Sequence, residues 1–278
     1  DTSSSATLHV PSGTYLTYIN SDWAQYFEKI DDGESHGSYE NGVATVEEAG
    51  TLAFLIPGSD KYSITKLKVV GPLNGDDIRF IREMAGRDVN GNKTAGNLVD
   101  LDISEATIVE GGGAYYNVYY TKNDVVGYNM FEETILKQVF LPNSVISIDF
   151  SAFFDCTSLT SITLPENLTS ISNQAFQGCS SLTSITIPDG VTEIENSTFA
   201  YCTSLTSITL PENLTSIGGG AFYGCTSLTS INIPDGVTSI GMETFSDCSS
   251  LTSINIPDGV TFIDKNTFDG CTSLTSIT

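Results

Sequence analysis

Six cysteines recur along the C-terminal half of the chain, each 23 residues after the last. A fixed period of this length is typical of a solenoid, in which successive coils stack and equivalent residues form ladders. The six positions are Cys156, Cys179, Cys202, Cys225, Cys248 and Cys271, and the sequence has no other cysteine. The spacing therefore predicts stacked coils, an architecture that more often provides a binding surface than a catalytic centre.

Apolar residues recur with the same period and define the inside of each coil. One repeat contains Leu182, Ile185 and Phe199, and the equivalent positions are also apolar in all the other regular repeats. The spacing Leu-x-x-Ile-x-Leu/Ile predicts a short strand whose alternate side chains point inward. A proline follows the strand, Pro188 in this repeat, and predicts a turn.

These repeats resemble the BspA-like class of 23-residue leucine-rich repeats found in bacterial surface proteins. The resemblance rests on the strand motif of 182–188, the Val-Thr-x-Ile return of 191–194 and the Phe-x-x-Cys closure of 199–202. It covers five full periods and implies an α/β repeat fold, a right-handed leucine-rich repeat solenoid with an irregular α/β N-terminal region. An earlier, degenerate coil is expected to have Glu133 at the cysteine position.

The cysteine ladder allows two interpretations. Stacked coils place successive Cα atoms about 5 Å apart, which is within disulfide range, and the number of cysteines is even. Small apolar thiols also fill tight solenoid corners, and nothing in the repeat favours one pairing over another. We expect buried, reduced thiols; a thiol titration of the denatured, unreduced protein distinguishes the two states.

The first part of the chain lacks the 23-residue period. Its opening residues resemble the closing cap of a leucine-rich array, with a strand near Leu8 followed by an aromatic helix that includes Tyr18 and Trp23. The predicted segments are the cap-like residues 1–30, a linker at 31–42, irregular leucine-rich coils at 43–127 and regular repeats at 128–278.

Strands and helices are predicted to alternate between residues 43 and 127. Alternation predicts a strand at 64–70, leucine-rich spacing predicts one at 98–103, and a further strand is expected at 44–46. A helix is expected to begin at Leu52 and to stop at Pro57. Asn74 precedes two acidic residues that favour the dipole at the start of a second, short helix. Three glycines at 111–113 predict a loop before an aromatic strand at 115–120.

Acidic side chains dominate the composition, with 34 Asp and Glu against 11 Lys and Arg and a formal net charge of −23. Nucleic acid and anionic membrane surfaces are therefore poor partners, because both require basic patches. No apolar run is long enough to predict a membrane span, so direct membrane insertion is not expected. Basic protein surfaces and divalent cations fit the charge better.

Catalytic and metal sites have little support in the sequence. The two histidines, His9 and His36, lie in the cap-like strand and in the predicted linker. Helix capping and solvation explain the acidic pairs more simply than acid/base catalysis does; these pairs are Asp76 with Asp77 and Asp100 with Asp102. No cofactor is predicted; calcium is the one ion considered, because each turn carries a carboxylate such as Asp189.

The exposed strand face presents serine, threonine and asparagine side chains and no aromatic anchor. Protein interfaces usually centre on Trp, Tyr or Arg, so this face also fits a soluble spacer surface. A tyrosine-rich stretch at 115–128 is the preferred binding location, although these tyrosines fit a core equally well. The candidate binding residues are Tyr115, Tyr116, Tyr119, Tyr120, Ser184, Thr186, Ser207, Thr209, Ser230 and Asn232.

The resemblance implies a non-enzymatic, adhesin-like protein that is secreted or attached to the cell surface and binds host or bacterial surface proteins or glycans. The alternatives are a structural spacer that displays another domain, and an enzyme with its site at Asp76 or Asp77. Any signal or anchor is expected outside this sequence. Because Thr278 follows directly after a strand, we expect either a fragment or head-to-tail self-association, with residues 7–30 of another copy covering that edge.

Overall fold

A computed structural model of the chain describes residues 7–10, 14, 17, 29–31, 33 and 35–278. Near the N-terminus, β1 (Thr7–His9) pairs in parallel with β2 (Lys29–Asp31). The strand predicted around Leu8 is therefore present. The aromatic helix predicted to follow it, with Tyr18 and Trp23, lies outside the described residues.

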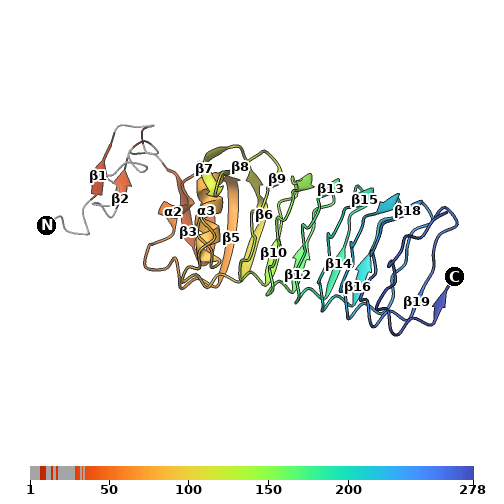
Figure 1. Cartoon of the computed structure of the whole chain (residues 1–278). Helices are drawn as coiled ribbons and strands as arrows, with labels where there is room; N and C mark the ends of the chain where they lie inside the picture. The colour runs from red at the N-terminus through yellow and green to blue at the C-terminus, as the bar shows by residue number, and fades with distance from the viewer. Residues whose placement is uncertain (1–6, 11–13, 15–16, 18–28, 32, 34) are drawn as a thin grey trace.

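One six-stranded sheet connects the irregular region to the first regular coils (Figure 1). Its strands pair in parallel except for the first two, which form an antiparallel hairpin. In spatial order the strands are β12 (Ser161–Thr163), β10 (Gln138–Phe140), β6 (Asp100–Ile108), β5 (Lys66–Leu73), β4 (Val43–Val46) and β3 (Gly37–Glu40). The predicted linker at 31–42 is thus corrected: Gly37–Glu40 forms the edge strand, because Val43–Val46 supplies it with a hydrogen-bonding partner.

Two short helices lie beside this sheet. Helix α2 (Leu52–Leu55) ends before Pro57, as the sequence predicted. Helix α3 (Gly75–Met84) begins with a capping box, in which the Asn74 side chain accepts a hydrogen bond from Asp76 N and the Asp77 carboxylate accepts one from Asn74 N. Its apolar side chains are buried against the sheet, which anchors the helix.

A β-hairpin replaces the predicted loop and aromatic strand. Strands β7 (Gly111–Tyr116) and β8 (Tyr119–Thr121) pair antiparallel, so the three glycines belong to a strand rather than to a loop. The turn between the strands includes Asn117, whose φ of 48° is left-handed. The tyrosines expected on one strand are consequently divided between two.

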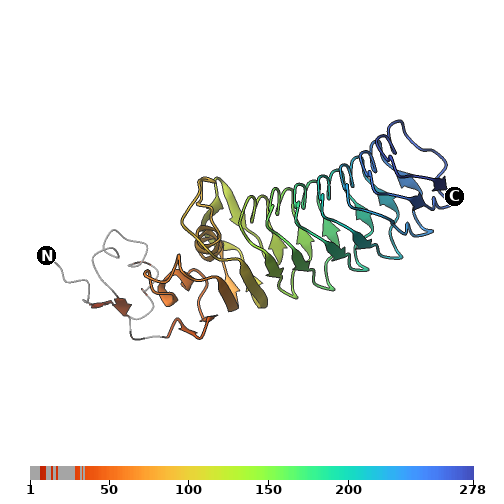
Figure 2. The ribbon, with the colours of Figure 1, turned by 90° about the horizontal axis from the view of Figure 1, so that it is seen from below.

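The regular coils stack side by side along one axis, and each contributes short strands that pair with the equivalent strands of its neighbours (Figures 1 and 2). Ser184 pairs with Ser207 and Ser216 with Ser239, each 23 residues further along the chain. The first strand series continues through β14 (Ser184–Thr186), β16 (Ser207–Thr209), β19 (Ser253–Ile254) and β20 (Ser276–Ile277). The second series comprises β9 (Val125–Val126), β11 (Ser147–Ile148), β13 (Ser170–Ile171), β15 (Glu193–Ile194), β17 (Ser216–Ile217) and β18 (Ser239–Ile240).

The inside of the array is a stack of phenylalanine rings. Neighbouring ring centroids lie 5.3 to 5.7 Å apart, with interplanar angles of 20° or less. The ladder consists of Phe131, Phe153, Phe176, Phe199, Phe222, Phe245 and Phe268. The leucine-rich repeat architecture is therefore confirmed, whereas the handedness of the coil stays a prediction.

The cysteines form a second ladder next to the phenylalanines, and all six are free thiols. Each thiol donates to a phenylalanine carbonyl of the preceding coil, as Cys202 Sγ does to Phe176 O at 3.2 Å. Burial raises the pKa of Cys202 to about 12, because the thiolate would lose its hydration. The ladder is thus a set of protonated donors that tie one coil to the previous one.

The degenerate first coil contains a correction to the predicted alignment. The ring of Phe131 stacks on Phe153, which is 22 residues away, so this coil has one residue fewer than the regular 23. Thr134, not Glu133, consequently takes the cysteine position: it is 2% exposed, its hydroxyl donates to Phe131 O, and it lies 3.5 Å from Cys156 Sγ. Threonine suits this corner because its hydroxyl, like the thiol, is a buried donor to a phenylalanine carbonyl, here that of its own coil.

The residue before each ladder cysteine has a left-handed backbone. At this corner φ is 50° at Asp155, 76° at Gly178, 60° at Tyr201 and 70° at Gly224, so glycines alternate with larger residues. A Cβ atom at Gly178 would overlap the Asp155 side chain of the preceding coil. The larger side chain of one coil therefore lies over the glycine of the next.

Apolar side chains of the last coils are exposed. Phe262 is 71% exposed and Ile277 is 52% exposed. Head-to-tail association through this end stays a prediction. No helix in the described part of the chain is long and apolar enough to cross a lipid bilayer.

Candidate functional site

The outward side chains of the first strand series form two rows that run along the array. Strand register places Gln138 beside Asp100 and Ser161, and Phe140 beside Asp102 and Thr163. Because side chains alternate across a strand, these residues face outward while the residues between them face the core. We call this surface, from β4 to β20, the strand face.

The strand face carries hydroxyl groups without protein partners. Of the predicted binding residues, Ser184, Thr186, Ser207 and Thr209 lie on β14 and β16, and all four are exposed. Ser230 and Asn232 are also exposed but lie outside any strand. In the described part of the chain, none of these six side chains makes a hydrogen bond with another protein group.

Hydroxyls just outside the strand face behave differently, because they are bonded to the preceding coil. Thr206 Oγ1 donates to Thr183 O at 3.1 Å, and Thr215 Oγ1 donates to Thr192 O at 3.0 Å. These side chains help to hold the stack together. The contrast leaves the hydrogen-bonding capacity of the strand-face hydroxyls available to water or to a ligand.

Three adjoining hollows follow the strand face through the N-terminal half of the array. Their volumes are 330, 510 and 350 Å³. Phe140 lines the first two, and Thr163, Leu164 and Glu166 line the second and third. The hollows therefore form one groove, which runs from Asn41 to Pro188 and which we call the strand-face groove.

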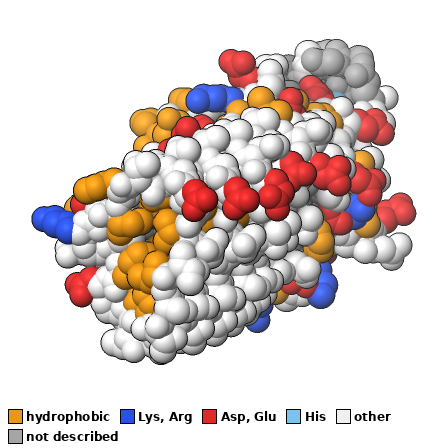
Figure 3. Space-filling view, turned by 90° about the vertical axis from the view of Figure 1, so that its right-hand side faces the viewer, with side chains coloured by type: hydrophobic (Ala, Val, Ile, Leu, Met, Phe, Trp, Pro, Cys, Tyr) orange, Lys and Arg blue, Asp and Glu red, His pale blue; other side chains and the backbone are white. Residues whose placement is uncertain are grey.

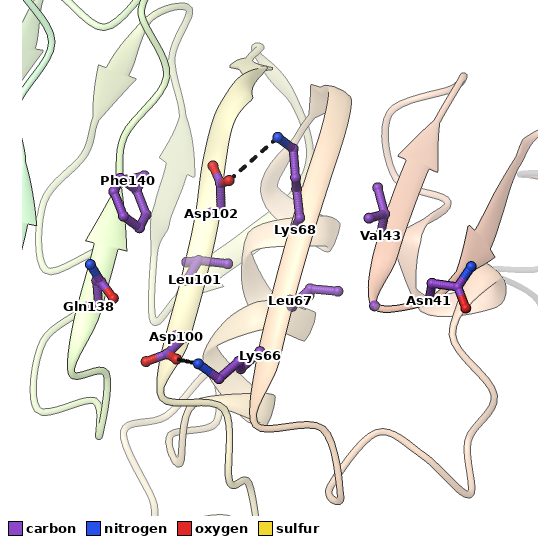
Figure 4. Close-up of a pocket in the computed structure, with 11 residues that line it drawn as sticks. Asn41, Val43, Lys66, Leu67, Lys68, Asp100, Leu101, Asp102, Gln138 and Phe140 are labelled. Atoms are coloured by element: carbon purple, nitrogen blue, oxygen red, sulfur yellow. Dashed lines mark ion pairs between the residues drawn. The ribbon is translucent and has the colours of Figure 1, made fainter.

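Ion pairs line the N-terminal end of the groove, where β5 and β6 lie side by side in the sheet (Figure 4). Lys66 Nζ lies 2.5 Å from Asp100 Oδ2, and Lys68 Nζ lies 3.5 Å from Asp102 Oδ2 and 2.5 Å from Glu105 Oε1. The hydrogen bond to Glu105 raises the pKa of Lys68. The two lysines are thus paired with three carboxylates at this end of the groove.

Asp102 is held as a carboxylate in this arrangement. Its partial burial raises its pKa, but hydrogen bonds from Ser104 N and Oγ and the Lys68 ammonium outweigh that effect, so the pKa lies below its ordinary value. Asp100 and Asp102 therefore serve in ion pairs across two strands, which is a structural arrangement and not that of an acid/base pair.

Phe140 is the aromatic group on the strand face that the sequence analysis missed. It is half-buried, and its ring is not stacked on another ring in the described part of the chain. Figure 4 shows it on β10 together with Gln138, next to Asp102 on β6. The alignment of Val139 with Ile162 already implied that Phe140 takes the place of Thr163 on the outer row.

The tyrosine-rich stretch divides into buried and exposed residues, so its members differ in whether they fit the core or a binding surface. Tyr115 is fully buried and donates through its hydroxyl to Tyr128 O at 2.9 Å. Tyr116 and Tyr119 are half-buried and stack with their centroids 6.3 Å apart. Only Tyr120 of the four candidates is well exposed, at 59%.

The stacked tyrosines continue as a row of rings on the hairpin side of the molecule. Tyr119 stacks on Tyr128 at 5.6 Å, and Tyr128 packs against Phe150 at 6.5 Å. The guanidinium of Arg82 lies 4.4 Å from the Tyr116 ring centroid at the inner end of the row. Because these rings cover one another's faces, the row mainly joins the hairpin to the coils.

The other acidic candidates also have structural partners. Asp76 pairs with Arg79 at 2.7 Å, and Asp77 caps helix α3. Burial raises the pKa of Asp77 to about 6, although backbone donors from Asn74, Leu52 and Gly50 counteract the shift. These contacts account for both carboxylates without a catalytic role.

Acidic side chains lie in a row along the array, as the view from its C-terminal end shows (Figure 3). The turns contribute one exposed carboxylate per coil, at Glu166, Asp189, Glu212, Asp235 and Asp258. Among the described residues, no three His, Cys, Asp or Glu side chains are placed to share a metal ion. The row is a solvated, negatively charged flank of the strand face.

Comparison with known families gives one match. A model of the BspA type leucine-rich repeat region matches residues 124–251 and 201–278, with six copies. Together these ranges include more than half of the chain and contain the whole cysteine ladder. A comparison with curated proteins gives no match.

Solved structures of bacterial leucine-rich repeat proteins share parts of the fold. A leucine-rich repeat protein of T. pallidum is 34% identical with a TM-score of 0.52, over 55% of this chain and 72% of that chain. One from Bacteroides ovatus is 40% identical with a TM-score of 0.49, over 50% of this chain and 39% of that chain. A leucine rich cell surface protein of Faecalibacterium prausnitzii is 28% identical with a TM-score of 0.43, over 62% and 61%. The alignment spans less than two thirds of the last two proteins.

Proposed function

Since the chain belongs to the BspA-type leucine-rich repeat family, we propose that it is a non-enzymatic, adhesin-like binding protein, secreted or displayed on a bacterial surface. The ligand is held on the strand face, and it belongs to a surface protein or glycan of the host or of another bacterium. Coils that stack without interruption provide a long, rigid platform for such contacts.

The observation that carries this proposal is the difference between two sets of hydroxyls. Thr206, Thr252 and Thr275 are bonded to the preceding coil, whereas Ser184 and Ser207 have no side-chain hydrogen bond to another group in the described part of the chain. The unpaired groups lie in two aligned rows beside a groove. A ligand with many polar groups can use them all at once.

A binding screen tests the proposal. The chain is immobilised and exposed to host matrix proteins, glycans and bacterial cells, and saturable binding to at least one of them is expected. The double variant Ser184→Gln, Ser207→Gln places two larger side chains on the strand face and should weaken that binding at least about tenfold. Ser239→Gln makes the same change at an exposed serine of β18, outside the strand face, and should have no effect.

Absence of saturable binding in the whole screen would contradict the proposal and favour the structural spacer. Saturable binding that is unaffected by Ser184→Gln with Ser207→Gln would place the ligand away from the strand face.

A further inference from the structure

We propose that the strand-face groove binds saccharide, with one sugar ring stacked on Phe140 and neighbouring rings in the hollows on either side. The inference rests on the proposed function, because it names the class of ligand that the strand face takes. It assigns a specific site within that face, centred on β10.

The position of Phe140 carries the first step. Its ring lines both the 330 Å³ hollow and the 510 Å³ hollow, so it lies at the point where the two meet. It is not among the side chains packed against the core cluster, although it is apolar and half-buried. An aromatic face that is not used for internal packing can take the apolar C–H face of a pyranose.

The polar groups around Phe140 carry the second step. Gln138 lies two residues before it on the same strand, and Thr163 lies beside it on β12. Neither side chain makes a hydrogen bond with another described protein group, so an amide and a hydroxyl are available, each able to donate and to accept. On the other side, Asp102 contributes carboxylate oxygens. Sugar hydroxyls require this mixture of donors and acceptors around an apolar surface.

The shape of the site favours a chain of sugars over a folded protein. The three hollows follow one another across β5, β6, β10, β12 and β14, so a ligand must be elongated and lie across the strands. Phe140 is the one large aromatic side chain that lines them, and no Trp, Tyr or Arg does. Protein interfaces depend on several such anchors.

The charge of this face disfavours acidic proteins and leaves a neutral glycan unaffected. The chain has a formal net charge of −23, and an acidic row flanks the strand face. Most acidic protein surfaces would be repelled, whereas a neutral glycan experiences no such repulsion. The backbone groups on the sheet face are already paired between strands, so an extended peptide cannot gain main-chain hydrogen bonds there.

The test uses four neutral tetrasaccharides: maltotetraose, cellotetraose, mannotetraose and acetylated chitotetraose. Calorimetry with the full chain should show saturable binding of at least one of them. Phe140→Leu keeps an apolar side chain and removes the ring, and it should weaken that binding about tenfold or more. Thr163→Val, which removes one hydroxyl without changing the side-chain shape, should weaken it several-fold.

The matched control is Phe150→Leu, the same change at an exposed aromatic residue outside the groove, which should leave the affinity unchanged. Thermal melts of all three variants show whether each one is folded. Saccharide binding that is unaffected by Phe140→Leu would overturn the site. If none of the four sugars binds while a protein from the screen binds in a manner sensitive to Ser184→Gln, the saccharide assignment fails and the proposed function stands. If nothing binds, both fail.

Discussion

The N-terminal region (residues 37–127) and the regular array (128–278) are stabilised in different ways. The array repeats one set of contacts in every coil: stacked phenylalanine rings, thiol-to-carbonyl bonds and threonine-to-carbonyl bonds. The N-terminal region depends on single residues, such as Arg82 and Asp77, that have no equivalent elsewhere.

This difference also separates the two kinds of surface. The array offers uniform rows of hydroxyls, whereas the charged end of the strand face comes from the N-terminal region. Phe140 lies at the junction, on the first strand of the degenerate coil. Repetition provides length and rigidity, while departures from the repeat provide the distinctive side chains of the groove.

The largest effect is expected in the middle of the phenylalanine stack. Phe199→Ala removes a fully buried ring that stacks on both neighbours, and should cost about 4 kcal/mol of the free energy of unfolding. Phe268→Ala, at a half-buried ring with one stacked neighbour, should cost about half as much. Urea titrations followed by circular dichroism measure both; equal losses would contradict a stack held by nearest neighbours.

A single residue of the N-terminal region should matter almost as much. Arg82 is fully buried, and its Nη1 donates to Asn129 O and Met130 O at 2.9 and 2.7 Å. Arg82→Met leaves these carbonyls without that donor and should lower the free energy of unfolding by about 3 kcal/mol. Arg79→Met, which removes a partly exposed ion pair, should cost less than about 1 kcal/mol in the same titration. A small loss for Arg82→Met would show that the repeats alone hold the junction.

The N-terminal region should also give the chain a pH dependence that can be assigned to one residue, Asp77. Burial raises the pKa of Asp77 to about 6, from an ordinary value of 3.8. Because the folded chain holds this proton more tightly than the unfolded chain, Asp77 adds stability below pH 4, and that contribution is lost as the pH rises through 6. The stability of the parent chain relative to Asp77→Asn should therefore fall by about 2 kcal/mol between pH 4 and pH 7.

Denaturant titrations at several pH values measure this difference, and Asp76→Asn is the control, since it leaves Asp77 in place. A relative stability that is flat with pH, or that rises, would contradict the assignment.

In the array, the thiol ladder should contribute a smaller amount at each coil. Cys202→Ala removes the donor to Phe176 O and a small buried volume, and should cost about 1 kcal/mol. In the folded chain, the six thiols should react slowly or not at all with an aromatic disulfide reagent, because burial raises their pKa values. After denaturation without reductant, all six should react. Fewer than six would reveal disulfides.

The smallest effect distinguishes the two sets of hydroxyls. Thr206→Val removes the bond to Thr183 O and should cost about 0.5 kcal/mol, whereas Ser207→Ala on the strand face should be neutral within error. Thermal melts of the two variants provide the comparison. A larger loss for Ser207→Ala would mean that the strand-face hydroxyl is structural and not reserved for a ligand.

The sequence predicted the array well because every coil repeats the same physical problem. The Leu, Ile, Phe and Cys positions were read from their period, and the structure confirms their burial from Cys156 to Leu251, apart from the half-buried Ile208. The prediction was wrong at the first corner, where the coil is one residue shorter than the others. Thr134, not Glu133, therefore takes the cysteine position there, and a fixed spacing of 23 cannot detect such a deletion.

The candidate site was predicted only in part, because exposure depends on contacts that are distant in the sequence. Ser184 and Ser207 face outward as their alternation required, but Tyr115 is buried under residues that follow it by more than ten positions. Phe140 was overlooked because it replaces a threonine inside an otherwise regular motif. A comparison of each repeat position with its equivalents would have identified it.

The alternation of glycine with larger residues before the ladder cysteines has a consequence for how such an array changes length. Removing one coil of the regular repeats would bring Gly178 next to Gly224, or Asp155 next to Tyr201, and so interrupt the alternation, as Glu133 and Asp155 do at the start of the array. Removing two coils together keeps the alternation. Within the regular repeats, two coils are therefore the unit that preserves this corner when longer or shorter binding surfaces are engineered from this chain.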